Sequence, residues 1–118
     1  MPTSQEKNMI IGALATGGVD AGMEAYYSYQ EGSGHSVANQ FPFIGIHPAL
    51  PPVDDLISNA GVPLLLYALG KTMKKPRIVE MAKGGAIYGV SELIGLTMYR
   101  LARFIQQPAL ATYVVTRR

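Results

Sequence analysis

Apolar residues gather in three stretches of helix length, and polar, charged or Gly- and Pro-rich segments separate them. This pattern predicts helices over about 5–29, about 53–71 and about 77–106. Ser4 is a suitable N-cap for the first helix, because its side chain can accept a hydrogen bond from a free backbone N–H. The predicted fold is therefore all-α, with about three helices in a single domain spanning residues 1–118.

The second helix carries its own start signal and a break. Pro51 and Pro52 precede it, and acidic residues follow in its first turn, where the helix dipole favours negative charge. Pro63 lies well inside the helix and cannot donate the hydrogen bond that would reach the carbonyl of Asn59. We therefore expect helix 53–71 to be kinked near Pro63.

The connections differ in character. Segment 31–52 is a long loop rich in Gly and Pro, without Lys or Arg but with several apolar residues, so we expect it to dock at an interface or on another subunit. Segment 71–77 is a short basic turn. The tail at 107–118 is rich in β-branched residues and is expected to be an extended arm that docks on a partner.

Composition favours a membrane setting. Only 15% of the residues are charged, against roughly 25% in soluble domains, and 48% are hydrophobic. Segment 56–70 has no charge and contains both Gly and Pro, which are more frequent in membrane helices than in soluble ones. We therefore predict a small polytopic integral membrane protein, most simply of the cell membrane. Asp20, Glu24 and Glu92 interrupt the apolar runs, which leaves a soluble helical interaction module as an alternative.

The distribution of basic residues predicts an orientation. Lys and Arg crowd segment 71–83 and are absent from 32–53, so the positive-inside rule places the N-terminus inside and the 31–52 loop outside. The basic residues near the C-terminal end oppose this assignment. An ion pair between Glu24 and Arg100, which would lie at one level on parallel helices, would offset part of that cost.

Two glycine motifs, GGVDAG at 17–22 and GGAIYG at 84–89, lie inside predicted helices. Glycine costs about 1 kcal/mol relative to alanine in a helix, so a packing benefit is expected in return. Small residues four apart let helix backbones approach closely. The predicted packing positions are Gly18, Gly22, Gly85 and Gly89.

Carboxylates within the helices are the second feature of interest. On a helical wheel, Asp20 and Glu24 share a face opposite the first glycine motif, whereas Glu92 lies on the glycine face of its helix. An acid at such a position is a candidate functional residue. The structural alternative is that Glu92 accepts a hydrogen bond from Asn59, Ser58 or a tyrosine.

The sequence contains no recognisable catalytic motif. It has no cysteine, no phosphate-binding glycine loop and no catalytic triad context. Histidines and acids that could ligate a metal fit no known spacing, so no metal and no cofactor is predicted. These candidates are His35, His47, Asp54 and Asp55. A net charge of +2 gives no indication of nucleic-acid binding.

These features predict a non-catalytic accessory or structural subunit of a larger membrane protein complex, with a membrane enzyme complex as the first choice. Its partners would be larger membrane subunits and lipid. One alternative is a small homo-oligomeric pore or proton/ion conduit lined by the charged helix residues. These residues are Asp20, Glu24, Glu92 and Arg100. The same features are compatible with a structural protein of a virion membrane and with the soluble helical module.

Overall fold

The computed structural model describes residues 3–106, and within that range the chain is all-helical, as predicted. The elements are α1 (Ser4–Gly32), α2 (Val53–Leu56), the π-helical turn η1 (Ile57–Gly61), α3 (Val62–Thr72) and α4 (Pro76–Gln106). The Thr3 side chain, one residue before the expected cap, accepts a hydrogen bond from the Glu6 N–H at 3.1 Å and caps α1. The predicted C-terminal arm at 107–118 lies outside the described residues.

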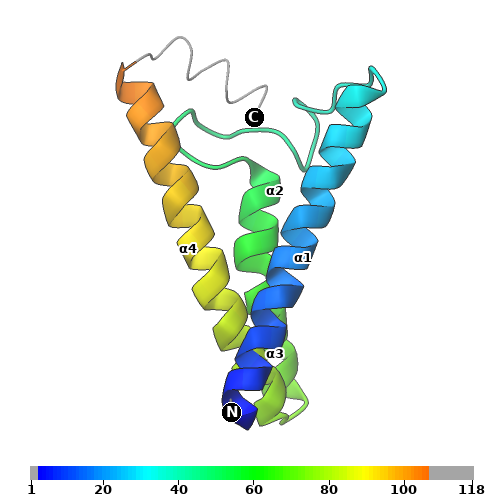
Figure 1. Cartoon of the computed structure of the whole chain (residues 1–118), viewed down its shortest axis with the longest axis vertical. Helices are drawn as coiled ribbons and strands as arrows, with labels where there is room; N and C mark the ends of the chain where they lie inside the picture. Colours follow the sequence, from blue (N-terminus) through cyan, green and yellow to red (C-terminus); the bar gives the residue numbers. More distant parts are fainter. Residues whose placement is uncertain (1–2, 107–118) are drawn as a thin grey trace.

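The two long helices, α1 and α4, lie close together at one end of the molecule and diverge toward the other (Figure 1). The rod formed by α2, η1 and α3 packs against both of them. The beginning of α1 and the turn between α3 and α4 lie at the narrow end, while the loop before α2 lies at the open end (Figure 1). The candidate site lies between α1, α2 and α4 toward the open end.

The irregularity expected in the second helix is present, but it precedes the proline. Residues 57–61 form a π-helical turn, and Pro63 follows in the first turn of α3. A π-helical turn contains one more residue than an α-helical turn, and such turns often mark functional positions. Here it lies where the missing N–H of Pro63 would interrupt the regular hydrogen-bond ladder.

Glycines allow the closest helix contacts, although not at all the predicted positions. A Cβ atom on Gly84 or Gly89 would collide with the backbone of Met9 or Asn59, and one on Gly85 would meet the Thr16 hydroxyl. Gly12, which lies outside both glycine motifs, abuts the Met81 carbonyl in the same way.

The prediction for Gly18 and Gly22 of the first motif is wrong within the described structure. A Cβ atom on Gly18 or Gly22 would have no neighbouring atom within 4 Å. The contact between α1 and α4 runs through Gly12 and Thr16, and Gly17 of the motif faces the Tyr88 ring of α4. Gly18 and Gly22 therefore lie on an exposed face of α1.

The loop at 33–52 docks on its own helix. Phe43 is buried at 4% exposure, and its ring packs against Tyr26 and Tyr27 with centroid distances of 5.8 and 5.5 Å. The Val53 N–H donates to the Ile44 carbonyl at 3.0 Å, which ties the end of the loop to the start of α2. Our expectation that these apolar residues serve a partner subunit is thus corrected for Phe43, whereas Phe41 remains 75% exposed.

None of the helices within residues 3–106 combines the length and the apolar composition required to cross a membrane. The prediction of membrane-spanning helices therefore has no support from the fold.

Candidate functional site: an acidic cavity between three helices

A cavity of about 460 Å³ lies between α1, α2 and α4 at the open end of the molecule. We call it the acidic cavity. Its lining residues are Asp20, Glu24, Tyr27, Ser28, Asp55, Glu92, Leu96 and Arg100. Residues distant in sequence therefore place four carboxylates and one guanidinium around a single space.

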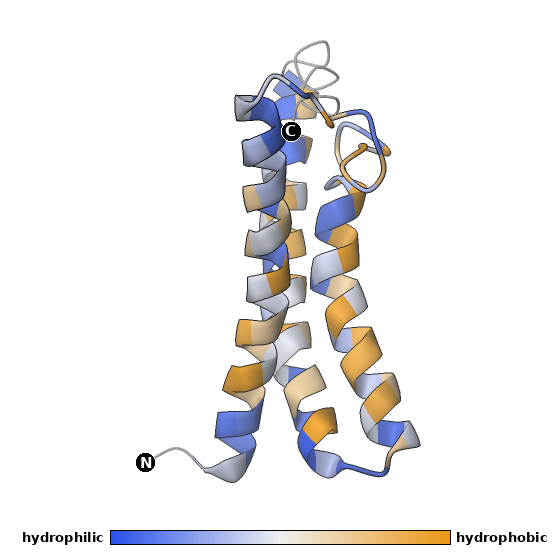
Figure 2. Ribbon diagram, turned by 90° about the vertical axis from the view of Figure 1, so that its right-hand side faces the viewer, coloured by the Kyte–Doolittle hydropathy of each residue, from blue (hydrophilic) through white to orange (hydrophobic). Residues whose placement is uncertain are grey.

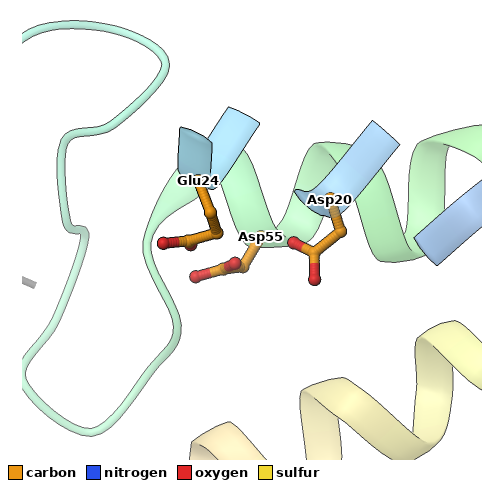
Figure 3. Close-up of side chains that lie close together, drawn as sticks. All are labelled: Asp20, Glu24 and Asp55. Atoms are coloured by element: carbon orange, nitrogen blue, oxygen red, sulfur yellow. The ribbon is translucent and has the colours of Figure 1, made fainter. Parts of the chain in front are cut away.

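Local structure explains how the acids meet. Asp20 and Glu24 lie one helical turn apart on α1, so both point to the same side. Asp55 faces them from the first turn of α2 (Figure 3). Oxygen atoms of these three carboxylates all lie within 4.8 Å of one another. The Ser58 hydroxyl donates a hydrogen bond to Asp20 Oδ1 at 3.1 Å and so links η1 to α1.

Burial changes the protonation of the two acids on α2. Desolvation raises the pKa of Asp55 to about 7, and the nearby charges of Asp54 and Asp20 and a hydrogen bond with Asp20 act in the same direction. Desolvation also raises the pKa of Asp54 to about 6, although backbone hydrogen bonds partly oppose it. Asp55 is therefore partly protonated at neutral pH, and the protonated form can donate a hydrogen bond to the Asp20 carboxylate.

Arg100 supplies the positive charge in the cavity. Its side chain is only 5% exposed, and burial lowers the pKa of the guanidinium while the charges of Asp55 and Asp54 raise it. Its Nη1 atom is buried without a hydrogen-bond partner among the described residues. The guanidinium therefore acts electrostatically on more than one carboxylate of the site.

The structure brings together the charged residues that the helical pattern singled out. Asp20, Glu24, Glu92 and Arg100 all line the acidic cavity. Two of the polar groups expected to bond Glu92, Ser58 and Asn59, have different partners, however. Ser58 donates to Asp20, and the Asn59 side-chain amide donates to the Asp55 carbonyl at 3.0 Å.

Asp55 is the member of this site that sequence reasoning misplaced. We considered it only as a metal-ligand candidate alongside the two histidines. Its position three residues after Pro52 showed that it lies in the first turn of a helix, but not which neighbouring helix it would face. That information comes only from the packing of α2 between α1 and α4.

The histidines lie elsewhere. His47 Nδ1 accepts a hydrogen bond from the Ala49 N–H at 3.0 Å, and its ring packs against Phe104 at 5.4 Å. Among residues 3–106, the group of three potential metal ligands is Asp20, Glu24 and Asp55, and it includes neither histidine. Hard cations favour such oxygen ligands. Within the cluster, a hydrogen bond between Asp55 and Asp20 and the charge of Arg100 oppose part of the repulsion between the acids.

Comparisons of the chain with protein-family models, with curated proteins and with solved structures found no match.

The raised pKa of Asp55 predicts a specific dependence of stability on pH. A folded-state pKa of about 7, above the ordinary value of 3.8, means that the folded protein binds a proton that the unfolded chain releases. We therefore expect the free energy of unfolding to fall by roughly 1–3 kcal/mol as pH rises from about 4 to about 7.

Asp55→Asn should flatten this part of the profile and stabilise the protein at pH 8. Helix unfolding followed by circular dichroism in mild detergent measures both effects. Glu6→Gln, which removes an exposed carboxylate, controls for the change in net charge. An unchanged pH profile in Asp55→Asn would exclude Asp55 as its source.

Proposed function

We propose that this chain is a non-catalytic helical subunit of a larger membrane protein complex, in which partner subunits and lipid cover its outer surface. The observation that carries this proposal is the distribution of polarity: the most deeply buried side chains are largely polar, and large apolar side chains lie outside. Soluble monomers rarely expose contiguous apolar patches, and larger patches mark interaction with proteins or membranes.

The interior contains few apolar side chains. Among the described residues, the buried hydrophobic ones are Val37, Ala38, Phe43 and Ala82. The buried polar and charged ones are Thr16, Asp54, Asp55, Ser58, Asn59 and Arg100. The stabilisation from apolar burial among these residues is therefore small. Covering the exposed apolar side chains with partner subunits or lipid would add to it.

Large apolar side chains are exposed on α1, α3 and α4. Leu14 of α1, Leu64 of α3 and Ile105 of α4 are 69%, 68% and 69% exposed. On α4, Ile87, Val90 and Ile94 form an exposed strip at helical spacing. Figure 2 shows hydrophobic residues along the lengths of the helices. Contact with lipid and partner helices would cover such strips, and the inward-facing acids would stay away from them.

Within this proposal, the acidic cavity serves assembly rather than catalysis. Its hydrogen bonds and charges connect α1, α2 and α4, which have little apolar core to hold them together. Buried polar networks fix one arrangement of elements when their members are satisfied.

Membrane fractionation and purification test the proposal. We expect the tagged full chain to stay with membranes through salt and alkaline washes. Mild detergent should release it together with a stable set of larger proteins. Recovery in the aqueous phase without detergent would contradict the membrane assignment. A homo-oligomer without larger partners would contradict the accessory role and favour the pore.

A surface variant makes this test specific. Replacing both Ile87 and Ile94 with Ser removes two exposed apolar side chains and should lower the recovery of partners several-fold. Ser91→Thr changes the same exposed face without removing an apolar group, and it should retain the partners. Equal recovery with both variants would show that this face of α4 is not the interface.

A further inference from the structure

A second cavity, of about 430 Å³, lies at the narrow end of the molecule and is basic. We call it the lysine cavity. Its lining residues are Gly70, Lys71, Lys74, Lys75, Pro76, Val79, Glu80 and Lys83. All four lysines are exposed, so a group from outside can reach their ammonium groups.

The turn between α3 and α4 holds this cavity in shape. Lys74 adopts a left-handed conformation with φ of 56°, and the Lys75 N–H donates to the Gly70 carbonyl at 2.9 Å. Gly70 lets α3 pack tightly on α4, because a Cβ atom there would meet Val79. The turn therefore directs several lysines to one region through main-chain geometry.

The acid in this cavity has another partner. Asn8 of α1 donates a hydrogen bond to Glu80 Oε1 at 2.8 Å, which directs this carboxylate toward α1. Lys71 Nζ lies 5.6 Å from the centre of the Tyr67 ring. Pro76 begins the 31-residue helix α4, whose N-terminal dipole adds partial positive charge at the same place. The cavity is therefore suited to an anion, and phosphate is a group that lysines and helix N-termini bind.

An apolar strip leads directly to the lysines. Leu65, Leu69 and Met73 follow each other at intervals of four residues and are 60%, 42% and 51% exposed. Figure 2 shows hydrophobic residues along α3 and hydrophilic ones around the turn at its end. An apolar strip that ends in a cluster of lysines fits the boundary between acyl chains and headgroups, where lysine side chains reach the charged surface.

We infer that the lysine cavity binds the headgroup phosphate of an anionic phospholipid, while the strip formed by Leu65, Leu69 and Met73 contacts the acyl chains. This inference rests on the proposed membrane function and names the lipid class involved. Charge complementarity and the adjoining apolar strip favour lipid over an acidic protein surface, which would not require the strip.

Vesicle flotation tests the inference. The purified full chain is mixed with phosphatidylcholine vesicles with or without phosphatidylglycerol, and the fraction that floats is measured. Near a membrane surface each Lys contributes about 1 kcal/mol, so Lys71→Gln/Lys74→Gln/Lys75→Gln should lower partitioning into anionic vesicles on the order of 100-fold. Binding to neutral vesicles should stay unchanged, and high salt should reduce the difference.

The control variant Lys7→Gln/Arg77→Gln also removes exposed basic charge, from residues outside the lysine cavity. It should have a much smaller effect. Equal losses per removed charge in the two variants would show that only general surface charge matters and would overturn the lysine cavity as a site. Equal binding to neutral and anionic vesicles would overturn the inference but leave the proposed function intact. Failure to bind either vesicle would contradict the proposed function itself.

Discussion

Substituting Gly12 or Gly84 with alanine is expected to destabilise the protein by about 3 kcal/mol or more. A Cβ atom at Gly12 would collide with the Met81 carbonyl, and one at Gly84 with the backbone around the Met9 carbonyl. Overpacking usually costs 1–3 kcal/mol when side chains can adjust, but here two helix backbones would have to separate. Helix unfolding followed by circular dichroism in mild detergent measures the loss.

Gly18 and Gly22 provide a matched control on α1. Both have open space where a Cβ would lie, so alanine there should stabilise the helix by roughly 0.5–1 kcal/mol through its better helix propensity. The same substitution should therefore have opposite signs at Gly12 and Gly18. If Gly12→Ala were as stable as Gly18→Ala, α1 and α4 would not pack through Gly12.

Arg100→Met is expected to cost roughly 3 kcal/mol at pH 8 and clearly less at pH 5. Arg100 is the buried cation beside Asp54 and Asp55, and removing it leaves buried carboxylates without compensation. At pH 5 both of these acids, with pKa values raised to about 6 and about 7, are mostly protonated and need less compensation. Unfolding measured at both pH values tests this dependence.

Two further variants separate charge from packing. Arg103→Met makes the same chemical change three residues further along α4, where Arg103 Nη1 donates to the exposed Tyr99 hydroxyl at 3.4 Å, and it should cost less than Arg100→Met. Adding Asp55→Asn to Arg100→Met should recover part of the stability at pH 8. Equal losses at pH 5 and pH 8, without recovery in the double variant, would assign the effect of Arg100 to packing alone.

These outcomes bear on how the subunit is held together. Close contact at glycines joins α1 to α4 near the narrow end, and the acidic cavity connects the helices where they diverge. The glycine contact and the acidic cavity lie at different positions along α1, since Gly12 precedes Asp20 by two helical turns. We therefore expect the energetic effects of Gly12→Ala and Asp55→Asn to be close to additive.

The sequence by itself determined which residues form helices. The structure begins the second helix at Val53 and the last at Pro76, close to the predicted 53 and 77, because prolines, acidic first turns and apolar spacing act locally. The helical wheel also correctly placed Asp20 and Glu24 on one face, since 100° per residue needs no tertiary information.

Only the tertiary structure decided what those faces meet. Gly18 and Gly22 look like packing positions, yet α1 meets α4 through Gly12, Thr16 and Gly17, because the crossing point of two helices depends on both surfaces together. In the same way, Asp55 joins the acids of α1 because α2 packs between α1 and α4. Helical periodicity gives the direction in which a side chain points around the axis of its helix. The neighbour in that direction follows from contacts between residues far apart in the chain.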